Sequence, residues 1–175
     1  MPTYPGSFLR QALLAIFFVG LLQTSLHAQT TPSAVDMVEQ LKTQPPRTRS
    51  LRNLTIESAA PEARPSLSLL IQFDFNSAQV KPESQQALSN LAHALQSREL
   101  LESKFAVEGH TDAKGRADYN LKLSQQRADA VRAYLAGNGV LDARLQAVGK
   151  GSSELVNSAD PLAAENRRVR IVNLN

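Results

Sequence analysis

Residues 105–137 read FAVEGHTDAKGRADYNLKLSQQRADAVRAYLAG, and this stretch decides the fold. Large apolar side chains alternate with other residues over 105–109, a period of two that predicts a β-strand. Over 118–136 apolar residues recur every three or four positions, which predicts an amphipathic α-helix. Residues 137–139 read Gly-Asn-Gly, a combination that ends helices. The stretch therefore predicts a strand, a polar loop and a helix in succession.

The same two periods recur on both sides of this stretch. Strands are predicted over 67–75, 144–150 and 167–174, and a first helix begins at Pro82 and carries an apolar stripe over 88–95. The order is strand, helix, strand, helix, strand, strand. We therefore predict an α+β domain of βαβαββ topology, with a mixed four-stranded sheet and two helices packed on one face.

The N-terminal residues 1–28 differ from the rest of the chain in composition. Arg10 is their only charged side chain, and an apolar run follows over 12–22. This layout predicts a secretory signal peptide. Eleven residues of helix rise only ~16 Å, about half of the ~30 Å hydrocarbon core of a membrane. We expect no transmembrane segment after cleavage; the alternative is an uncleaved anchor in the inner membrane.

Residues 29–66 hold five of the nine prolines and contain neither glycine nor an aromatic residue. Such a segment buries too little apolar surface to offset its ordering entropy. We predict a Pro-rich periplasmic tether here, with two possible helical turns over 35–41, and a folded domain over 67–175. The alternative is a small arm that docks on the domain or on a partner.

The composition excludes several classes of protein. The chain contains no cysteine, which excludes disulfides, thiolate metal sites and a cysteine nucleophile, and we expect no lipid attached through an N-terminal cysteine. Its 19 Lys and Arg against 16 Asp and Glu give a net charge of +3. This surplus is too small to favour nucleic-acid binding.

Three polar residues interrupt the apolar face of the helix predicted over 118–136. Asn120, Ser124 and Arg127 lie at i, i+4 and i+7, one above the other. A buried guanidinium without a partner costs several kcal/mol, roughly, so Arg127 needs a partner. Helical side chains lean toward the N-terminus, which directs Arg127 to the preceding loop and makes Asp112 its predicted partner.

This pair admits two interpretations. It is either a structural salt bridge between loop and helix, or the two charged ends of a pocket for a zwitterionic ligand. In the second case Arg127 binds a carboxylate by two parallel hydrogen bonds and Asp112 binds an ammonium group. Asn120 and Asn76 would then contact amide or carboxylate oxygens of the ligand.

Motifs in four separate places resemble one known family. They are Glu108-Gly109-His110-Thr111-Asp112 with Gly115, Tyr119-Asn120, Leu123-Ser124, Arg127-Ala128 and Val131; residues 73–78; residues 149–151; and residues 166–169. Together they are similar to the OmpA-like C-terminal domain, the peptidoglycan-binding module of Gram-negative bacteria. The resemblance covers roughly residues 67–175.

The resemblance implies a ligand and a set of binding residues. The ligand is the stem-peptide diaminopimelate of peptidoglycan, whose side chain ends in an ammonium and a carboxylate on one carbon. By resemblance Asp112 binds the ammonium group and Arg127 the carboxylate. The full set of expected ligand-binding residues is Asp112, Arg127, Asn120, Asn76, Thr111 and Arg167, with Arg167 the weaker candidate.

We therefore predict a non-catalytic periplasmic protein that binds peptidoglycan non-covalently and needs no cofactor, with association with the outer membrane as a further expectation. The alternative is an envelope structural or assembly protein whose residues 29–66 bind another protein, with Asp112–Arg127 a structural salt bridge. His110 and Asp112 supply two metal ligands where a catalytic zinc takes three, and Ser124 lacks the strand-to-helix turn of a serine hydrolase. The sequence thus predicts neither a metal site nor an enzyme.

Overall fold

The computed structural model describes residues 31–42, 64–74 and 76–175, which all belong to one folding unit. The predicted signal peptide lies outside the described residues, as do residues 43–63 of the predicted tether. Within the described ranges, no helix combines the length and the apolar character that crossing a membrane requires.

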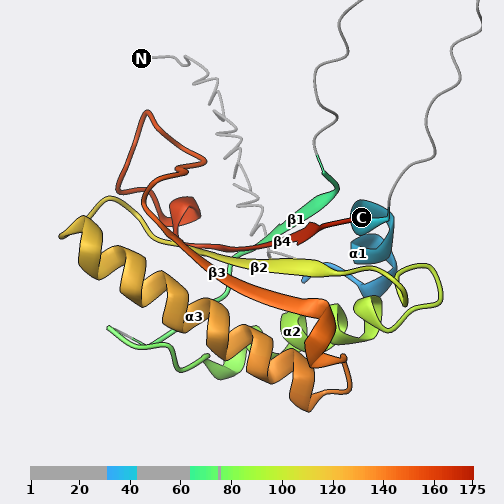
Figure 1. Cartoon of the computed structure of the whole chain (residues 1–175). Helices are drawn as coiled ribbons and strands as arrows, with labels where there is room; N and C mark the ends of the chain where they lie inside the picture. The colour runs from blue at the N-terminus through green and yellow to red at the C-terminus, as the bar shows by residue number, and fades with distance from the viewer. Residues whose placement is uncertain (1–30, 43–63, 75) are drawn as a thin grey trace, which may run out of the picture. The chain divides into compact units, whose positions relative to one another are not determined.

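The architecture is a four-stranded mixed sheet with three α-helices (Figure 1). The sheet has the order β1-β4-β2-β3, in which β4 pairs antiparallel with β1 and β2, and β2 pairs parallel with β3. The elements are α1 (Ala34–Leu41), β1 (Ser66–Leu69), α2 (Pro82–Leu95), β2 (Phe105–His110), α3 (Ala117–Gly137), β3 (Leu145–Gly151) and β4 (Val169–Asn173). The predicted α+β class and mixed sheet are confirmed, with one helix more than expected.

The additional helix is α1, in the segment that we assigned to the tether. Ser33 and Asp36 form a capping box at its start. Met37 and Leu41 are completely buried, and the side-chain amide of Asn173 donates a hydrogen bond to the Leu41 carbonyl at 2.9 Å. Residues 31–42 therefore pack on the domain as an arm, because α1 has an apolar face that the sheet and α2 cover.

Two predicted strands are shorter than expected. The predicted strand 67–75 pairs only over Ser66–Leu69, followed by an isolated bridge between Phe73 and Val80. The predicted strand 167–174 pairs only from Val169, because a short 3-10 helix, Ala164–Asn166, precedes it. This helix is held by the buried amide of Asn166, which donates to two carbonyls of the preceding loop at 3.0 and 3.1 Å.

One apolar core lies between the sheet and the helices. Odd-numbered strand residues face the helices, as the period of two predicts. All three helices contribute to the core, whose largest completely buried side chains include Met37, Leu41, Leu88, Leu91, Leu95, Phe105, Val107, Val131, Leu135 and Ile171.

Glycines let α3 approach the sheet at backbone distance. A Cβ atom added to Gly109 on β2 would lie 2.2 Å from the carbonyl oxygen of Ser124, and one on Gly149 of β3 would lie 2.6 Å from the nitrogen of Gln125. At this separation the Ser124 hydroxyl accepts a hydrogen bond from the Gly151 N–H at 2.8 Å, and the Gln125 side chain accepts one from the Gly149 N–H at 2.7 Å. Side chains of α3 thus satisfy backbone groups of the edge strand β3.

We predict that Gly109→Ala strongly destabilises the domain. The new methyl group meets a helix backbone that cannot rotate away, so we expect a loss of about 1–3 kcal/mol or more in the free energy of unfolding. Urea denaturation of purified protein measures this loss.

The matched control is Gly137→Ala at the exposed end of α3, where an added Cβ meets nothing within 4 Å. It should leave stability unchanged or raise it, because alanine is the better helix former. Equal stability of Gly109→Ala and wild type would contradict the close approach of α3.

Candidate ligand-binding site

The loop between β2 and α3 carries two of the predicted site residues, Thr111 and Asp112. The Thr111 N–H donates to the carbonyl of Gly151 at 2.8 Å, which fixes the start of the loop to β3. The side-chain amide of Asn120 donates to the carbonyls of Asp112 and Lys114 at 3.3 and 3.0 Å. The loop is therefore held from two sides before any ligand binds.

Asn120 has a structural role in this loop. It is only 4% exposed, and its amide nitrogen is engaged by the loop carbonyls. The structure shows that this amide nitrogen holds the loop, and a ligand contact of Asn120 stays a prediction.

Asp112 is oriented by two contacts. Its Oδ1 accepts a hydrogen bond from the Lys114 N–H at 3.1 Å, and its Oδ2 lies 2.8 Å from Nη1 of Arg167 in an ion pair. The Asp112 side chain is mostly buried, with 15% exposed, whereas 47% of the Arg167 side chain is exposed. The carboxylate is thus fixed, and its partner lies at the surface.

The predicted ion pair between Asp112 and Arg127 is not formed in the part of the chain that the structure describes. Asp112 pairs with Arg167 instead, because the 3-10 helix Ala164–Asn166 carries that residue to the loop. Arg127 donates through Nε to the carbonyl of Ser77 at 3.1 Å, and its guanidinium lies 4.8 Å from the centre of the Phe73 ring. The alternative of a structural Asp112–Arg127 salt bridge is therefore wrong in its geometry.

The contacts of Arg127 leave its terminal nitrogens available. Nε binds the Ser77 carbonyl and the guanidinium plane is held near the Phe73 ring, a cation–π arrangement. No hydrogen bond joins Nη1 or Nη2 to a described residue. An oriented guanidinium with two unused terminal nitrogens is suited to a carboxylate.

Electrostatics link Arg127 to the loop despite the missing ion pair. Burial lowers the pKa of Arg127 below its usual value, and the nearby charge of Arg167 acts in the same direction. Tyr119 and Asp112 act in the opposite direction and favour the charged form. Arg127, Arg167 and Asp112 therefore share one site, in which two positive charges face one negative charge.

The remaining predicted residues lie around this site. Thr111 is 4% exposed, and its hydroxyl has no hydrogen-bond partner among the described residues. Asn76 is exposed and adopts a left-handed backbone with φ of 54°, directly before Ser77. This strained conformation turns the chain so that the Ser77 carbonyl meets Arg127.

Sequence reasoning missed Phe73 and Ser77 as parts of the site. Phe73 was assigned to the apolar alternation of a strand, and the contribution of Ser77 is a backbone carbonyl, which no side-chain pattern reveals. In the sequence the apolar alternation continues through Phe75, so the pattern gave no signal that Phe73 and Ser77 contribute to the site.

We predict that Asn120→Ala destabilises the domain by about 1–3 kcal/mol, because two loop carbonyls lose their donor. Urea denaturation measures the loss, and amide hydrogen exchange of residues 112–115 should become faster. Gln126→Ala, at an exposed position of the same helix, is the control and should change neither. Unchanged stability and exchange in Asn120→Ala would show that Asn120 does not hold the loop.

Comparison with known proteins identifies the family. The OmpA family model matches residues 72–169. The chain is 41% identical over 105 residues to outer membrane porin F of Pseudomonas fluorescens, covering 59% of this chain and 32% of the porin. It is 37% identical over 100 residues to the peptidoglycan-associated lipoprotein of Brucella melitensis, covering 56% of this chain and 58% of the lipoprotein. The match thus spans less than two thirds of either relative.

A solved structure agrees with these sequence matches. The crystal structure of the peptidoglycan-associated lipoprotein from Burkholderia pseudomallei superimposes with a TM-score of 0.51 at 36% identity, covering 61% of this chain and 88% of that one. The family match includes β2, α3 and the residues of the site, Arg127, Asp112 and Arg167. The chain belongs to the OmpA family.

Proposed function

We propose that this protein binds peptidoglycan non-covalently, as a non-catalytic component of the Gram-negative cell envelope. The ligand group is the zwitterionic end of the stem-peptide diaminopimelate. Arg127 binds its carboxylate and Asp112 binds its ammonium group. The protein acts in the periplasm, in association with the outer membrane.

The observation that carries this proposal is the state of Arg127. Its guanidinium is fixed by the Ser77 carbonyl and the Phe73 ring, while both terminal nitrogens lack a hydrogen bond to a described residue. A fixed guanidinium loses little freedom when it binds, and its two parallel N–H groups match the geometry of a carboxylate.

The position of Asp112 suits the ammonium group of the same ligand. Its carboxylate is held by the Lys114 N–H, while its partner Arg167 is exposed and long enough to share or leave the carboxylate. Arg167 holds the Asp112 carboxylate in its orientation in the free protein. When the ligand binds, Arg167 adds positive charge beside the ligand carboxylate.

The relatives support the cell envelope as the place of action. The names of those at 37–41% identity describe a peptidoglycan-associated lipoprotein and an outer membrane porin. A site that offers a carboxylate and guanidinium groups to the opposite charges of one ligand fits adhesion.

We propose a protein partner only for the part of the predicted tether that does not pack on the domain. The apolar side of α1 is already covered by the domain, with Met37 and Leu41 completely buried. Residues 43–63 lie outside the described residues, and a partner would bind there.

We predict that Arg127→Ala weakens binding to purified peptidoglycan sacculi by about tenfold to a hundredfold, because charge-assisted hydrogen bonds contribute about 1.5–3 kcal/mol. Arg127→Lys should recover only part of the binding, since an ammonium group cannot make two parallel hydrogen bonds. Co-sedimentation with sacculi measures both.

Arg132→Ala is the matched control for these variants. Arg132 lies on α3 and pairs with Asp142 at the surface, so its loss should leave sedimentation and melting temperature nearly unchanged. Folded Arg127→Ala protein that sediments like wild type would contradict the proposed site.

We further predict that free diaminopimelate raises the melting temperature in a concentration-dependent way, because it binds only the folded state. Pimelate lacks both ammonium groups and cadaverine lacks both carboxylates, so neither should raise it at equal concentration. Asp112→Asn should abolish the discrimination between diaminopimelate and pimelate. A melting temperature unaffected by diaminopimelate at every concentration would refute the ligand assignment while leaving the family intact.

A further inference from the structure

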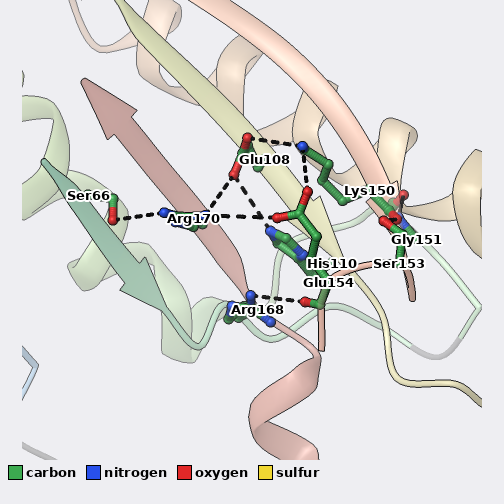
Figure 2. Close-up of polar contacts among 10 residues, drawn as sticks. Ser66, Glu108, His110, Lys150, Gly151, Ser153, Glu154, Arg168 and Arg170 are labelled. Atoms are coloured by element: carbon green, nitrogen blue, oxygen red, sulfur yellow. Dashed lines mark hydrogen bonds and ion pairs between the residues drawn. The ribbon is translucent and has the colours of Figure 1, made fainter. Parts of the chain in front are cut away.

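A second polar cluster lies on the face of the sheet opposite the α-helices (Figure 2). Gly109 faces α3, so its neighbours Glu108 and His110 on β2 point to the other side. The charged or titratable side chains of this cluster are Glu108, His110, Lys150, Glu154, Arg168 and Arg170. The proposed peptidoglycan site uses none of them.

His110 is the unusual member of this cluster. Its side chain is completely buried, and neither ring nitrogen has a hydrogen-bond partner among the described residues. Its Nε2 lies 3.8 Å from Oε2 of Glu108, an oxygen that is also buried without a hydrogen bond. Buried polar atoms are paired in the great majority of native structures, so these atoms point to a group that binds between them.

We propose that Glu108, His110 and Glu154 form a binding site for a divalent transition-metal ion such as Zn²⁺. One ligand atom of each residue lies within 4.8 Å of the other two. Zinc binds imidazole nitrogen and carboxylate oxygen at ~2.0–2.2 Å, so small side-chain rotations bring the three atoms to coordination distance. Glu154 can supply most of this movement, because it lies in the loop after β3 with 44% of its side chain exposed.

The ligand set favours zinc over magnesium or calcium. One imidazole and two carboxylates leave an open fourth position, as in zinc sites with three protein ligands. Mg²⁺ and Ca²⁺ prefer oxygen ligands throughout.

Two basic side chains form ion pairs with the carboxylates of Glu108 and Glu154. Nζ of Lys150 lies 2.7 Å from Glu154 and 3.6 Å from Glu108. Nη1 of Arg170 lies 3.7 Å from Glu108 and 3.9 Å from Glu154. Both side chains are about a third exposed and can turn to solvent when the metal binds. Arg168 stays in place, since it donates to the Glu154 carbonyl at 3.2 Å.

This competition makes a directional prediction. Removing a carboxylate should weaken metal binding, and removing a competing cation should strengthen it. In a purely structural ion-pair network, removing a carboxylate and removing a cation should not change metal affinity in opposite directions.

A metal site on this face differs from the expectation that the chain has none. The sequence suggested His110 with Asp112, but Asp112 pairs with Arg167 in the peptidoglycan site. In the proposed site the other two ligands are Glu108, two residues before His110, and Glu154, in a loop distant in sequence.

The test is a Zn²⁺ titration of the full chain without an affinity tag, in a buffer that does not bind metal, followed by calorimetry and by melting temperature. We expect one Zn²⁺ ion per chain and a melting temperature that rises with Zn²⁺ but not with Mg²⁺. Glu154→Gln should weaken Zn²⁺ binding at least tenfold. Lys150→Gln should tighten it severalfold.

His93→Gln, at an exposed position of α2, is the control for binding at a surface histidine and should bind Zn²⁺ like wild type. Glu154 is the preferred ligand to change because it is partly exposed, whereas replacing the buried His110 risks the fold. Absence of Zn²⁺ binding, or equal affinities of wild type, Glu154→Gln and Lys150→Gln, would overturn the proposal.

Discussion

The close approach of α3 to the sheet is the constraint on which the rest of the structure depends. Gly109 and Gly149 carry no side chain at the two points where the helix backbone touches β2 and β3. Only at this separation can the Ser124 hydroxyl reach the Gly151 N–H at 2.8 Å. The helix therefore has one position on the sheet. This position also sets where Arg127 lies relative to the β2–α3 loop.

The polar stripe on α3 divides into two roles once its contacts are known. Asn120 and Ser124 are buried and bind backbone groups of the loop and of β3. Arg127, one turn further on, binds the Ser77 carbonyl through Nε, and its terminal nitrogens make no hydrogen bond to a described residue. Since all three interrupt an apolar face in the same way, the pattern alone does not separate a residue that holds the fold from one that binds.

The two faces of the sheet carry different chemistry. The helix face ends in the proposed peptidoglycan site, where Asp112 is fixed near the start of the β2–α3 loop. The opposite face holds the buried imidazole of His110 among charged side chains. Alternation along β2 separates them, because adjacent residues of a strand point to opposite sides. One strand with its loop therefore contributes to both proposed sites.

The sequence by itself determined the elements with strong periodicity: α2, β2 and α3 lie where the patterns over 82–95, 105–109 and 118–136 predicted them. It also singled out Arg127, because a charge on an apolar helix face is rare, and Asp112 in the preceding loop as the opposite charge. Only the tertiary structure decided their partners. Asp112 pairs with a residue 55 positions away and Arg127 with a carbonyl 50 positions away, and Asn173 binds α1 across 132 positions. Local patterns report which face of an element is buried, whereas the choice among several possible partners depends on how distant segments pack together.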